Sequence, residues 1–498
     1  MIPSPEIHAA ALVPLALPAL GSLVVLMAEA YLSKRASEAR LGSMSAGIAI
    51  FFLSLSFLVA AQHFMTGARI VFDSASPMIR IDPFSSFAIC VIAGASILAC
   101  LLSIAYLMEL HINHAEYYAL ILLATSGMML MVAAVDLITV FLGLELMSIP
   151  IYVLAGFERR DLRSNESALK YLLIGSFASA ILLYGMALVY GVTGHTDFDG
   201  IRAGFDATNP LALVGLGLIT IGFAFKVSSV PFHQWTPDVY EGAPTVVTAY
   251  MSITVKTTAF LALMRFVVEA MGPAASAASL SGLFWGLAAI TMIVGNVMAV
   301  IQDNVKRMLA YSSISHAGYL LIGFATATPE AYAAVLFYLV VYVFMTLGAF
   351  SVMVTLAHRG KDCDRFEEFS GLASSRPGLA ALMTLFMVAL AGIPPTGGFY
   401  AKFALFGAAV KAGNVGLTIL AVLMSLVSIY YYLRLPVVMY MREAGAEAPR
   451  ADTSLGEIVV LAVCAVAILF LGVFPNSPEF LSSIRVFDWA RTSVALLF

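Results

Sequence analysis

Charged residues are scarce in this sequence. Only 11% of its 498 residues are Asp, Glu, Lys or Arg and 61% are hydrophobic, whereas a soluble globular protein has about 25% charged residues. A water-soluble fold is therefore excluded. The net charge is −4, and no segment gathers the basic residues as a nucleic-acid-binding protein does. We expect no nucleic acid among its partners.

Cysteine is equally sparse, and several catalytic signatures are missing. The four cysteines, Cys90, Cys100, Cys363 and Cys464, lie far apart without CxxC spacing. This pattern excludes a disulfide framework, a cysteine metal site and a redox cofactor bound through cysteine. The sequence also lacks a glycine-rich phosphate loop, an HExxH motif and a nucleophile elbow. Nothing therefore indicates nucleotide binding or hydrolysis.

Long apolar runs are abundant. A helix needs about 20 apolar residues to cross about 30 Å of hydrocarbon, and we mark fourteen runs of this kind. They leave no room for a sizeable soluble domain, so we predict an all-α polytopic membrane protein. No positively charged segment precedes the first run, which is predicted to be a retained helix and not a secretory signal. The predicted spans are residues 9–30, 41–62, 83–107, 116–135, 137–157, 167–190, 211–235, 245–270, 281–302, 308–326, 331–357, 378–412, 417–440 and 456–474.

Lys and Arg residues between the runs are concentrated on one side of the predicted membrane. The loops that follow the odd-numbered runs hold most of them, for example Arg159, Arg160 and Arg163. Because positive residues stay on the cytoplasmic side, these loops are predicted to be cytoplasmic. Both termini then lie on the outer side, as an even number of spans requires.

Four charged residues lie deep inside apolar runs, where each costs about 2.5–3.5 kcal/mol on insertion scales. They are Glu145, Lys226, Lys256 and Lys402. One interpretation is that they hold helices together through ion pairs; the other is that they line a hydrated pathway of titratable groups. Burial favours a neutral lysine and a nearby carboxylate favours a charged one. A lysine paired with Glu145 would therefore change its protonation state when the partner moves, which favours the pathway.

Three further basic residues lie nearer to the ends of their runs. Arg265 and Arg434 are predicted to extend their long side chains to the membrane surface. Lys170 lies close enough to the start of its run for the same interpretation, although its position alone leaves a functional role open.

Two runs contain helix-breaking residues. Pro231 removes a backbone donor, and Ser228 and Ser229 beside it are expected to bond the carbonyl groups that the break frees, with His233 directly after. The segment Gly392–Gly398 places two prolines and three glycines within one long run. Broken helices that line a cavity mark ion pathways in transporters. Because the seventh and twelfth runs are five apart, we predict an inverted repeat of five helices.

Other polar residues lie near these breaks. Ser312, Ser313 and His316 share a helix face by their spacing, and histidine is suited to relay protons near neutral pH. A purely structural histidine is an equally good interpretation. Asp238 and Glu241 follow the first break, and we assign them no role.

The residues around these features resemble a known family. They are FLGLELMSIPIYVL around Glu145, KVSSVPFHQWTPDVYEGAPTVVTAYMSITVK from Lys226 to Lys256, YSSISHAGYLL around His316 and AGIPPTGGFYAKF around Lys402. Together they resemble subunit N of the bacterial proton-pumping NADH:quinone oxidoreductase, respiratory complex I. No long amphipathic extension follows the last run, which favours subunit N over the largest antiporter-like subunit of that complex.

The resemblance implies an antiporter-like fold of fourteen transmembrane helices with helices 7 and 12 broken. Residues 1–115 would form three N-terminal helices, and residues 116–270 the first five-helix half-channel repeat. Residues 281–440 would form the second, inverted five-helix repeat, and residues 441–498 the last helix and the tail.

The resemblance also implies roles in proton translocation, driven by electron transfer from NADH to quinone in neighbouring subunits. Glu145 would be the acid paired with a lysine, and Lys226 the pumping lysine at the first break. Lys256 would connect the two halves, and Lys402 would be the exit-side lysine.

Three more residues join the candidate site. Lys170 matches the family's lysine on helix six, and His233 would lie on the cytoplasmic side of the channel. His316 is added as a proton relay because of the chemistry of its side chain.

The resemblance implies no cofactor in this chain, with FMN, iron–sulfur clusters and quinone in partner subunits. The expected partners are other membrane-arm subunits, including adjacent antiporter-like and small membrane subunits, and the lipid bilayer. The expected location is the bacterial inner membrane, with both termini periplasmic. Two alternatives remain: a subunit of a multi-subunit sodium/proton antiporter, and a non-pumping structural subunit of the membrane arm.

Overall fold

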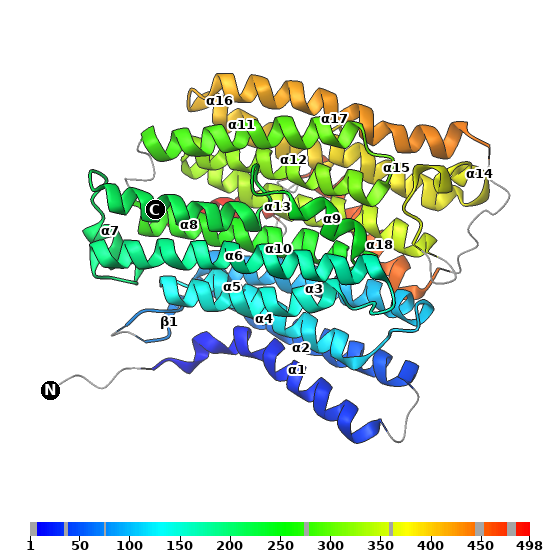
Figure 1. Ribbon diagram of the computed structural model, residues 1–498, viewed down its shortest axis with the longest axis horizontal. Helices are drawn as coiled ribbons and strands as arrows, with labels where there is room; N and C mark the ends of the chain where they lie inside the picture. Colours follow the sequence, from blue (N-terminus) through cyan, green and yellow to red (C-terminus); the bar gives the residue numbers. More distant parts are fainter. Residues whose placement is uncertain are drawn as a thin grey trace.

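Long helices run side by side through the whole molecule (Figure 1). The computed structural model describes residues 7–33, 38–73, 76–272, 278–357, 362–443, 453–475 and 485–498. Apolar runs of this length favour helices because a helix satisfies its own backbone N–H and C=O groups where water is excluded. Within the described residues the all-α prediction is confirmed, apart from one two-stranded hairpin.

The helices differ widely in length. The first six are α1 (Val13–Leu32), α2 (Glu38–Thr66), α3 (Pro83–Glu109), α4 (Ala115–Ala133), α5 (Leu137–Ala155) and α6 (Leu162–Thr193). The next four are α7 (Phe198–Gly204), α8 (Pro210–Lys226), α9 (Trp235–Gly242) and α10 (Thr245–Arg265), which continues as a π-helical segment, Phe266–Ala270. The following five are α11 (Ala278–Val300), α12 (Val305–Thr326), α13 (Pro329–Leu356), α14 (Leu372–Ser375) and α15 (Pro377–Ala391). The last four are α16 (Gly397–Lys411), α17 (Val415–Met441), α18 (Leu455–Val473) and α19 (Val486–Ala495). Short 3₁₀ segments cover Ala9–Leu12 and Phe366–Phe369.

Eleven helices of the described chain are long and apolar enough to cross a membrane. Two other apolar helices, α8 and α15, are shorter, and each is followed after a turn by a second helix, α9 or α16. The predicted runs 211–235 and 378–412 are thus each divided between two helices. The helix α12, also predicted as a span, is not among the eleven. The total of fourteen spans stays a prediction.

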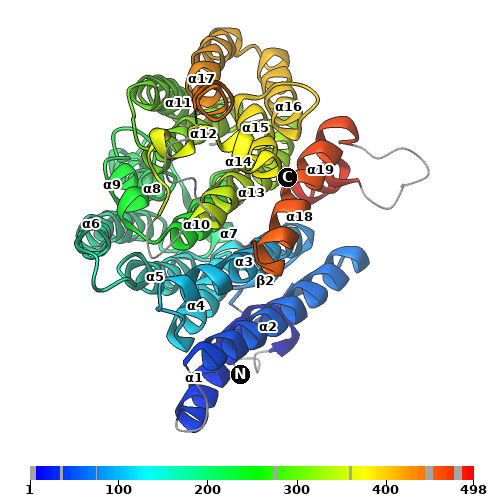
Figure 2. The same cartoon turned by 90° about the vertical axis from the view of Figure 1, so that its right-hand side faces the viewer.

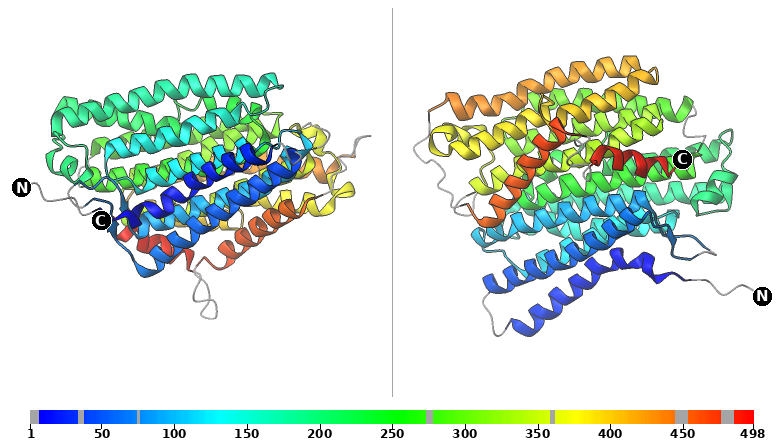
Figure 3. Two further views of the ribbon diagram at one scale, coloured as in Figure 1. Left: turned by 90° about the horizontal axis from the view of Figure 1, so that it is seen from below. Right: turned by 180° about the vertical axis from the view of Figure 1, so that it is seen from behind.

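The helices α10 and α13 form the centre of the bundle. The most apolar stretch of α10 is 100% buried and that of α13 is 94% buried. Seen end-on in Figure 2, α11, α12 and α15–α17 lie on one side of this pair, and α4–α6, α8 and α9 lie on the other. The helices α18 and α19 cross the back of the bundle and contact α13 and α3 (Figure 3). Charges on α10 therefore lie far from lipid.

The turn after α8 is shaped by hydroxyl and indole groups. At the end of this helix, one residue before Lys226, the carbonyl of Phe225 accepts a hydrogen bond of 3.1 Å from the indole of Trp235. The prediction that the nearby serines bond the carbonyl groups at the break is confirmed for their backbone N–H groups: Ser228 donates to Phe225 at 3.1 Å and Ser229 donates to Ala224 at 2.8 Å. The hydroxyl of Ser229 bonds the hydroxyl of Thr291 on α11 at 2.9 Å, because α11 packs directly against the turn.

The second break depends on glycine. Gly392 ends α15 with a φ of 82°, a left-handed conformation that disfavours other residues. Gly398, at the start of α16, lies so close to the carbonyl of Ala389 that no Cβ atom would fit. The two helices are therefore joined by a short connection, which leaves the carbonyl groups at the end of α15 open to a side chain.

Close contact between α4 and α5 gives a stability prediction. A Cβ atom at Gly143 would lie 2.8 Å from the backbone nitrogen of Met131, so Gly143→Ala must push the two helices apart. We expect the free energy of unfolding to fall by about 1–3 kcal/mol, as overpacking does, measured by thermal unfolding in detergent. Gly47→Ala on α2 is the control, because its Cβ atom meets open space. Equal stability of the two variants would contradict the prediction.

Two small features escaped the sequence analysis. Strands β1 (Ile70–Val71) and β2 (Arg80–Ile81) form an antiparallel hairpin before α3, too short to give a pattern. In the tail, Phe487 of α19 packs edge-on against Phe337 with ring centroids 5.3 Å apart. The tail is therefore anchored on the central helix α13.

Candidate functional site

The ammonium group of Lys226 is surrounded by neutral groups. The residue is only 2% exposed. Its Nζ donates hydrogen bonds to the hydroxyls of Ser148 (2.8 Å) and Tyr152 (3.3 Å) on α5. The rings of Tyr152 and Tyr171 face Nζ at 5.3 and 5.6 Å from their centroids, where an aromatic ring attracts a cation. The charge is therefore stabilised without a bonded carboxylate.

Glu145 lies on the same face of α5 as the two hydroxyl groups. The structure shows no direct ion pair between Glu145 and Lys226; the lysine bonds the Ser148 hydroxyl, which itself donates to the carbonyl of Leu144. The carboxylate of Glu145 is still close enough to act on the Lys226 charge, and Oε1 is buried without a hydrogen-bond partner in the described chain. Ser148 and Tyr152 were missed in the sequence, although their spacing of three and seven residues from Glu145 marks one helix face.

Lys256 lies in the middle of α10 and is 1% exposed. Its Nζ donates to the backbone carbonyl and to the hydroxyl of Ser313 on α12. The hydroxyl of Tyr342 on α13 donates to the same Ser313 hydroxyl at 2.9 Å. This lysine thus joins three helices through neutral oxygen atoms.

Lys402 is bound to the helix end that the second break exposes. Its Nζ donates to the carbonyl groups of Ala391 (2.9 Å) and Leu390 (3.3 Å), the last two residues of α15. A helix C-terminus carries partial negative charge, which favours a cation there. The ring of Tyr319 lies 4.9 Å from the same ammonium group. Again no carboxylate is bonded to the lysine.

His316 lies fully inside the bundle and both of its ring nitrogens are bonded. Nδ1 lies 2.7 Å from the hydroxyl of Tyr338 on α13, and Nε2 lies 3.1 Å from the hydroxyl of Tyr432 on α17. Ser312 contacts the same Tyr432 hydroxyl, whereas Ser313 contacts Lys256 on α10. Ser313 also bonds the hydroxyl of Tyr342, whose ring centroid lies 5.4 Å from that of His316, so the predicted shared face is confirmed for all three residues.

Lys170 belongs to an ion-pair network at the rim. Its Nζ pairs with Glu166 (2.6 Å) and Asp238 (2.8 Å), and its side chain is 39% exposed. Asp238 and Glu241 also pair with Arg307 at 2.8 and 2.7 Å. Both acids were left without a role in the sequence analysis. Their partners lie about 70 residues away in the chain, so no local spacing could reveal the network.

His233 lies in the turn between α8 and α9. Its Nδ1 is buried and has no hydrogen-bond partner in the described chain. Unpaired buried polar atoms are rare in folded proteins and call for a functional or structural explanation. No direct bond joins His233, Glu145, Lys226 or Lys402 to another of these four in the described chain.

A polar cavity of about 350 Å³ lies at the end of the bundle where α3 and α13 end and α10 and α12 begin. Its lining has more acidic than basic side chains. The acids are Glu158, Asp161, Glu241, Asp362 and Asp364, and the bases are Arg163 and Lys306. An excess of carboxylates in a recess raises the local concentration of cations and protons.

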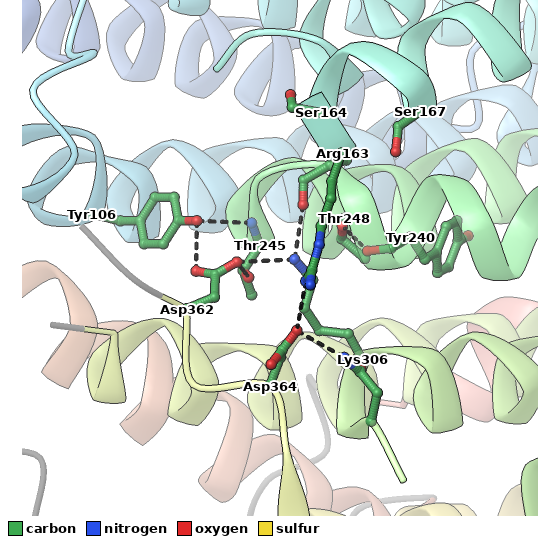
Figure 4. Close-up of polar contacts among 12 residues, drawn as sticks. Tyr106, Arg163, Ser164, Ser167, Tyr240, Thr245, Thr248, Lys306, Asp362 and Asp364 are labelled. Atoms are coloured by element: carbon green, nitrogen blue, oxygen red, sulfur yellow. Dashed lines mark hydrogen bonds and ion pairs between the residues drawn. The ribbon is translucent and has the colours of Figure 1, made fainter. Parts of the chain in front are cut away.

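Asp362 is the best-bonded carboxylate of this cavity (Figure 4). It accepts hydrogen bonds from Tyr106 (2.8 Å), Thr245 (2.5 Å) and Lys306 (2.9 Å). Burial opposes its ionisation, but Lys306 and these hydrogen bonds together hold the pKa of its carboxyl group below the usual value. Burial, helped by repulsion from Asp161 and Asp362, raises the pKa of Glu158. Asp362 therefore stays charged and ties the loop after α13 to three helices.

An Asp362→Asn variant tests this anchor. At neutral pH we expect the free energy of unfolding to fall by about 1.5–3 kcal/mol, the usual contribution of a charged hydrogen bond. Because the folded-state pKa is lowered, the contribution is complete above the unfolded-state pKa of about 3.9 and is lost as the pH falls through the lower folded-state value. The thermal stability difference from wild type should thus be constant from about pH 5 to 8. Asp303→Asn, at a side chain that is 89% exposed, is the control; a loss as large there would contradict the prediction.

Arg265 corrects a prediction. Its side chain does not reach the membrane surface but is 1% exposed and pairs with Asp82 and, at 3.2 Å, with Glu269. Its guanidinium group also donates to the carbonyl of Val132 at 2.7 Å, and Glu269 pairs with Arg80. Asp82, at the start of α3, pairs with the arginine inside the bundle. The arginine is therefore bonded to carboxylates, whereas Lys226, Lys256 and Lys402 are not.

Arg434 is partly exposed, and its position at the membrane surface stays a prediction. Its side chain is 32% exposed, and it pairs with exposed Asp303 at 2.7 Å. It also stacks over the ring of Phe366 at 4.3 Å. The guanidinium group therefore lies at the surface of the bundle.

No cluster of three or more His, Cys, Asp or Glu side chains among the described residues could hold a metal ion.

Comparison with known proteins decides the family. The sequence profile of the family described as NADH:quinone oxidoreductase/Mrp antiporter, TM, matches residues 134–428. NADH-quinone oxidoreductase subunit N of Trichlorobacter lovleyi is 46% identical over 85% of this chain and 88% of that protein. The chain belongs to the NADH-quinone oxidoreductase subunit N family. Within this family, subunit N 1 of Sorangium cellulosum is 42% identical over 93% of this chain and 96% of that protein.

Solved structures agree with membership of the subunit N family. A chain of respiratory complex I from Thermus thermophilus is 31% identical, with a TM-score of 0.79 over 93% of this chain and 97% of that one. A chain of the Mrp complex from Dietzia sp. is 23% identical, with a TM-score of 0.83 over 97% of both chains. The second likeness shows the fold alone. Together with the family profile, these structures confirm the predicted antiporter-like fold.

Proposed function

We propose that the chain is the proton-translocating membrane subunit N of an NADH-quinone oxidoreductase, complex I. One observation, beyond membership of the family, supports proton translocation. Lys226, Lys256 and Lys402 are buried, yet each is bonded only to neutral oxygen atoms in the described chain. A buried lysine without a bonded carboxylate can release its proton, because burial favours the neutral form. Charges that only hold helices together are paired, as Arg265 is.

The proposed path follows the buried charged groups. Glu145 acts on the charge of Lys226, which the Ser148 hydroxyl holds in place, and movement of Glu145 changes the protonation of Lys226. The proton passes through Lys256 and leaves by Lys402. Lys170 and His233 serve the cytoplasmic end, and His316 relays protons between Lys256 and Lys402.

The proposed architecture has fourteen spans. The pairs α8/α9 and α15/α16 count as the seventh and twelfth spans, and α12 counts as the tenth despite its polar residues. Residues 116–270 and 281–440 then form two inverted five-helix repeats. The end of the bundle with the acidic cavity faces the cytoplasm, and both termini face the periplasm.

The energy for translocation comes from neighbouring subunits in this proposal. They hold FMN, iron–sulfur clusters and the quinone site, and this chain carries no redox chemistry. Its partners are the adjacent antiporter-like and small membrane subunits of the membrane arm, in the bacterial inner membrane. The identity of 40–46% to named subunits N, against 23% to the Mrp chain, favours this function over a sodium/proton antiporter.

Purification of the tagged chain in mild detergent tests the function. We expect NADH:quinone reductase activity, with flavin and iron–sulfur absorbance, in the same fractions as the tag. A flavin-free preparation that exchanges sodium for protons after reconstitution would instead support the antiporter.

Ser148→Ala tests the proposed link of Lys226 to α5 through the Ser148 hydroxyl. The substitution removes the closest acceptor of the Lys226 ammonium group, 2.8 Å away. We expect coupled quinone reduction to fall by about tenfold, at the lower end of what a positioned proton-transfer group contributes. Ser86→Ala is the control, since this buried hydroxyl on α3 has no hydrogen-bond partner in the described chain. Equal activities of the two variants would contradict the link.

A further inference from the structure

Four side chains from three helices form a continuous row of hydrogen bonds around His316. Along the row, Tyr338 of α13 bonds Nδ1 of His316, and Nε2 of His316 bonds Tyr432 of α17. The Tyr432 hydroxyl also bonds Ser312, one helical turn before His316 on α12. All four residues are at most 2% exposed. We call these four residues the His316 row.

The row lies between two of the proposed proton carriers. Lys256 contacts α12 at Ser313, and the ammonium group of Lys402 lies 4.9 Å from the ring of Tyr319 on the same helix. His316 is three residues, or about one turn, from each contact. A proton that moves from Lys256 to Lys402 therefore has to pass this section of α12.

The row has two equivalent hydrogen-bond arrangements. A neutral imidazole has one N–H donor and one acceptor nitrogen. With the proton on Nδ1, His316 donates to Tyr338, Tyr432 donates to Nε2, and Ser312 donates to Tyr432. With the proton on Nε2, every one of these bonds is reversed.

A single transfer event converts one arrangement into the other. A proton arrives at the Ser312 oxygen, whose own proton moves to Tyr432, and the Tyr432 proton moves to Nε2. The resulting imidazolium passes its Nδ1 proton to Tyr338, which releases its hydroxyl proton at the far end. Only O–H and N–H bonds break and form, and one proton leaves for each that enters.

We propose that Tyr432 and Tyr338 are proton-transfer residues on either side of His316. The proposal rests on the proposed function of the chain. Neither tyrosine stands out in the sequence, and α17 is otherwise a peripheral helix, with only 33% of its most apolar stretch buried. Tyr432 is fully buried and its hydroxyl bonds Ser312 and His316 of α12. Through this residue the outer helix α17 takes part in the proposed proton path.

The variants Tyr432→Phe and Tyr338→Phe remove one hydroxyl each and keep the ring packing. In reconstituted vesicles we expect coupled quinone reduction and proton uptake to fall by about tenfold or more, as when a positioned proton-transfer group is lost. The double variant should be no worse than either single one, because one gap already interrupts the row. Tyr332→Phe is the control: this buried tyrosine of α13 has a hydroxyl without a partner in the described chain, and its turnover should equal wild type.

A solvent isotope measurement separates proton transfer from packing. If the hydroxyls carry protons, their loss makes proton transfer rate-limiting, and turnover in D₂O relative to H₂O should fall further than in wild type. Activities are normalised to NADH oxidation by an artificial electron acceptor, which counts assembled complexes. Unchanged turnover in both variants would overturn the proposal. It would also be overturned if turnover fell in both variants, the D₂O/H₂O ratio stayed at the wild-type value and the two losses added in the double variant.

Two further outcomes are decisive. If Tyr432→Phe does not assemble, Tyr338→Phe decides, because it interrupts the row at its other end. Lys226→Ala is measured in parallel to test the underlying function. Loss of pumping in Lys226→Ala with full pumping in the tyrosine variants overturns only the His316 row; full pumping in all of them overturns the proposed function as well.

Discussion

A Lys226→Ala variant is expected to assemble with its partners and to lose its proton translocation, with coupled quinone reduction lower by about a hundredfold or more. Assembly should survive because the lysine is bonded only to neutral groups. Its removal leaves the hydroxyls of Ser148 and Tyr152, which are close enough to rebond, and it removes the cost of burying a charge. Translocation should fail because the Ser148 and Tyr152 hydroxyls that remain at this point do not take up a proton near neutral pH, whereas an amine does.

The measurement is proton uptake per NADH oxidised in reconstituted vesicles, with assembly scored by activity toward an artificial electron acceptor. Lys411→Ala provides the control, since Lys411 lies exposed at the end of α16 and outside the path. Wild-type pumping in an assembled Lys226→Ala complex would rule out the proposed path. It would leave the lysine as a structural group only.

For Arg265→Ala we expect the opposite outcome, a loss of stability without a specific effect on pumping. The substitution leaves the two buried carboxylates of Asp82 and Glu269 with Arg80 as the one remaining cation that pairs with both in the described chain. Breaking a buried ion pair in this way costs about 3–5 kcal/mol. Thermal unfolding in detergent should occur at a clearly lower temperature, and less assembled complex should be recovered.

The matched control is Arg202→Ala, at an exposed arginine of α7. Normal stability of Arg265→Ala would show that the cluster does not hold the ends of α10 and α3 together. Any surviving Arg265→Ala complex should pump normally per assembled unit, because the cluster lies outside the path. A pumping defect per assembled unit would contradict that assignment.

The contrast between these two variants reflects one physical difference. Arg265 is bonded to ionised carboxylates, which fix its charge, whereas Lys226 is bonded to hydroxyls and aromatic rings, which do not. Both are buried basic groups in an apolar bundle. Only the identity of their partners separates a structural charge from one that can exchange its proton.

Much of the fold and part of the site could be predicted from the sequence. Apolar runs revealed the helices because their length and composition are local properties. Lys226, Lys256 and Lys402 stood out because a charge within such a run has few explanations. The glycines and prolines before Lys402 marked the second break, where α15 ends and α16 begins.

The partners of these groups could not be predicted. Arg265 was expected at the membrane surface because it lies near the end of its run, but Asp82, 183 residues earlier, holds it inside. Lys226 bonds the hydroxyls of Ser148 and Tyr152, although a direct pair with Glu145 was expected. Asp362 and Tyr432 gave no signal at all, since their contacts come from other helices.

The helical membrane character of this protein, the course of its helices and the buried charges that need an explanation could all be predicted from the sequence. These follow from hydrophobicity and backbone hydrogen bonding, which act over a few turns of one helix. Which charges are paired with carboxylates and which are bonded to neutral groups is seen only in the folded structure. That distinction depends on a few ångströms between side chains from helices far apart in the chain, and no local pattern encodes it.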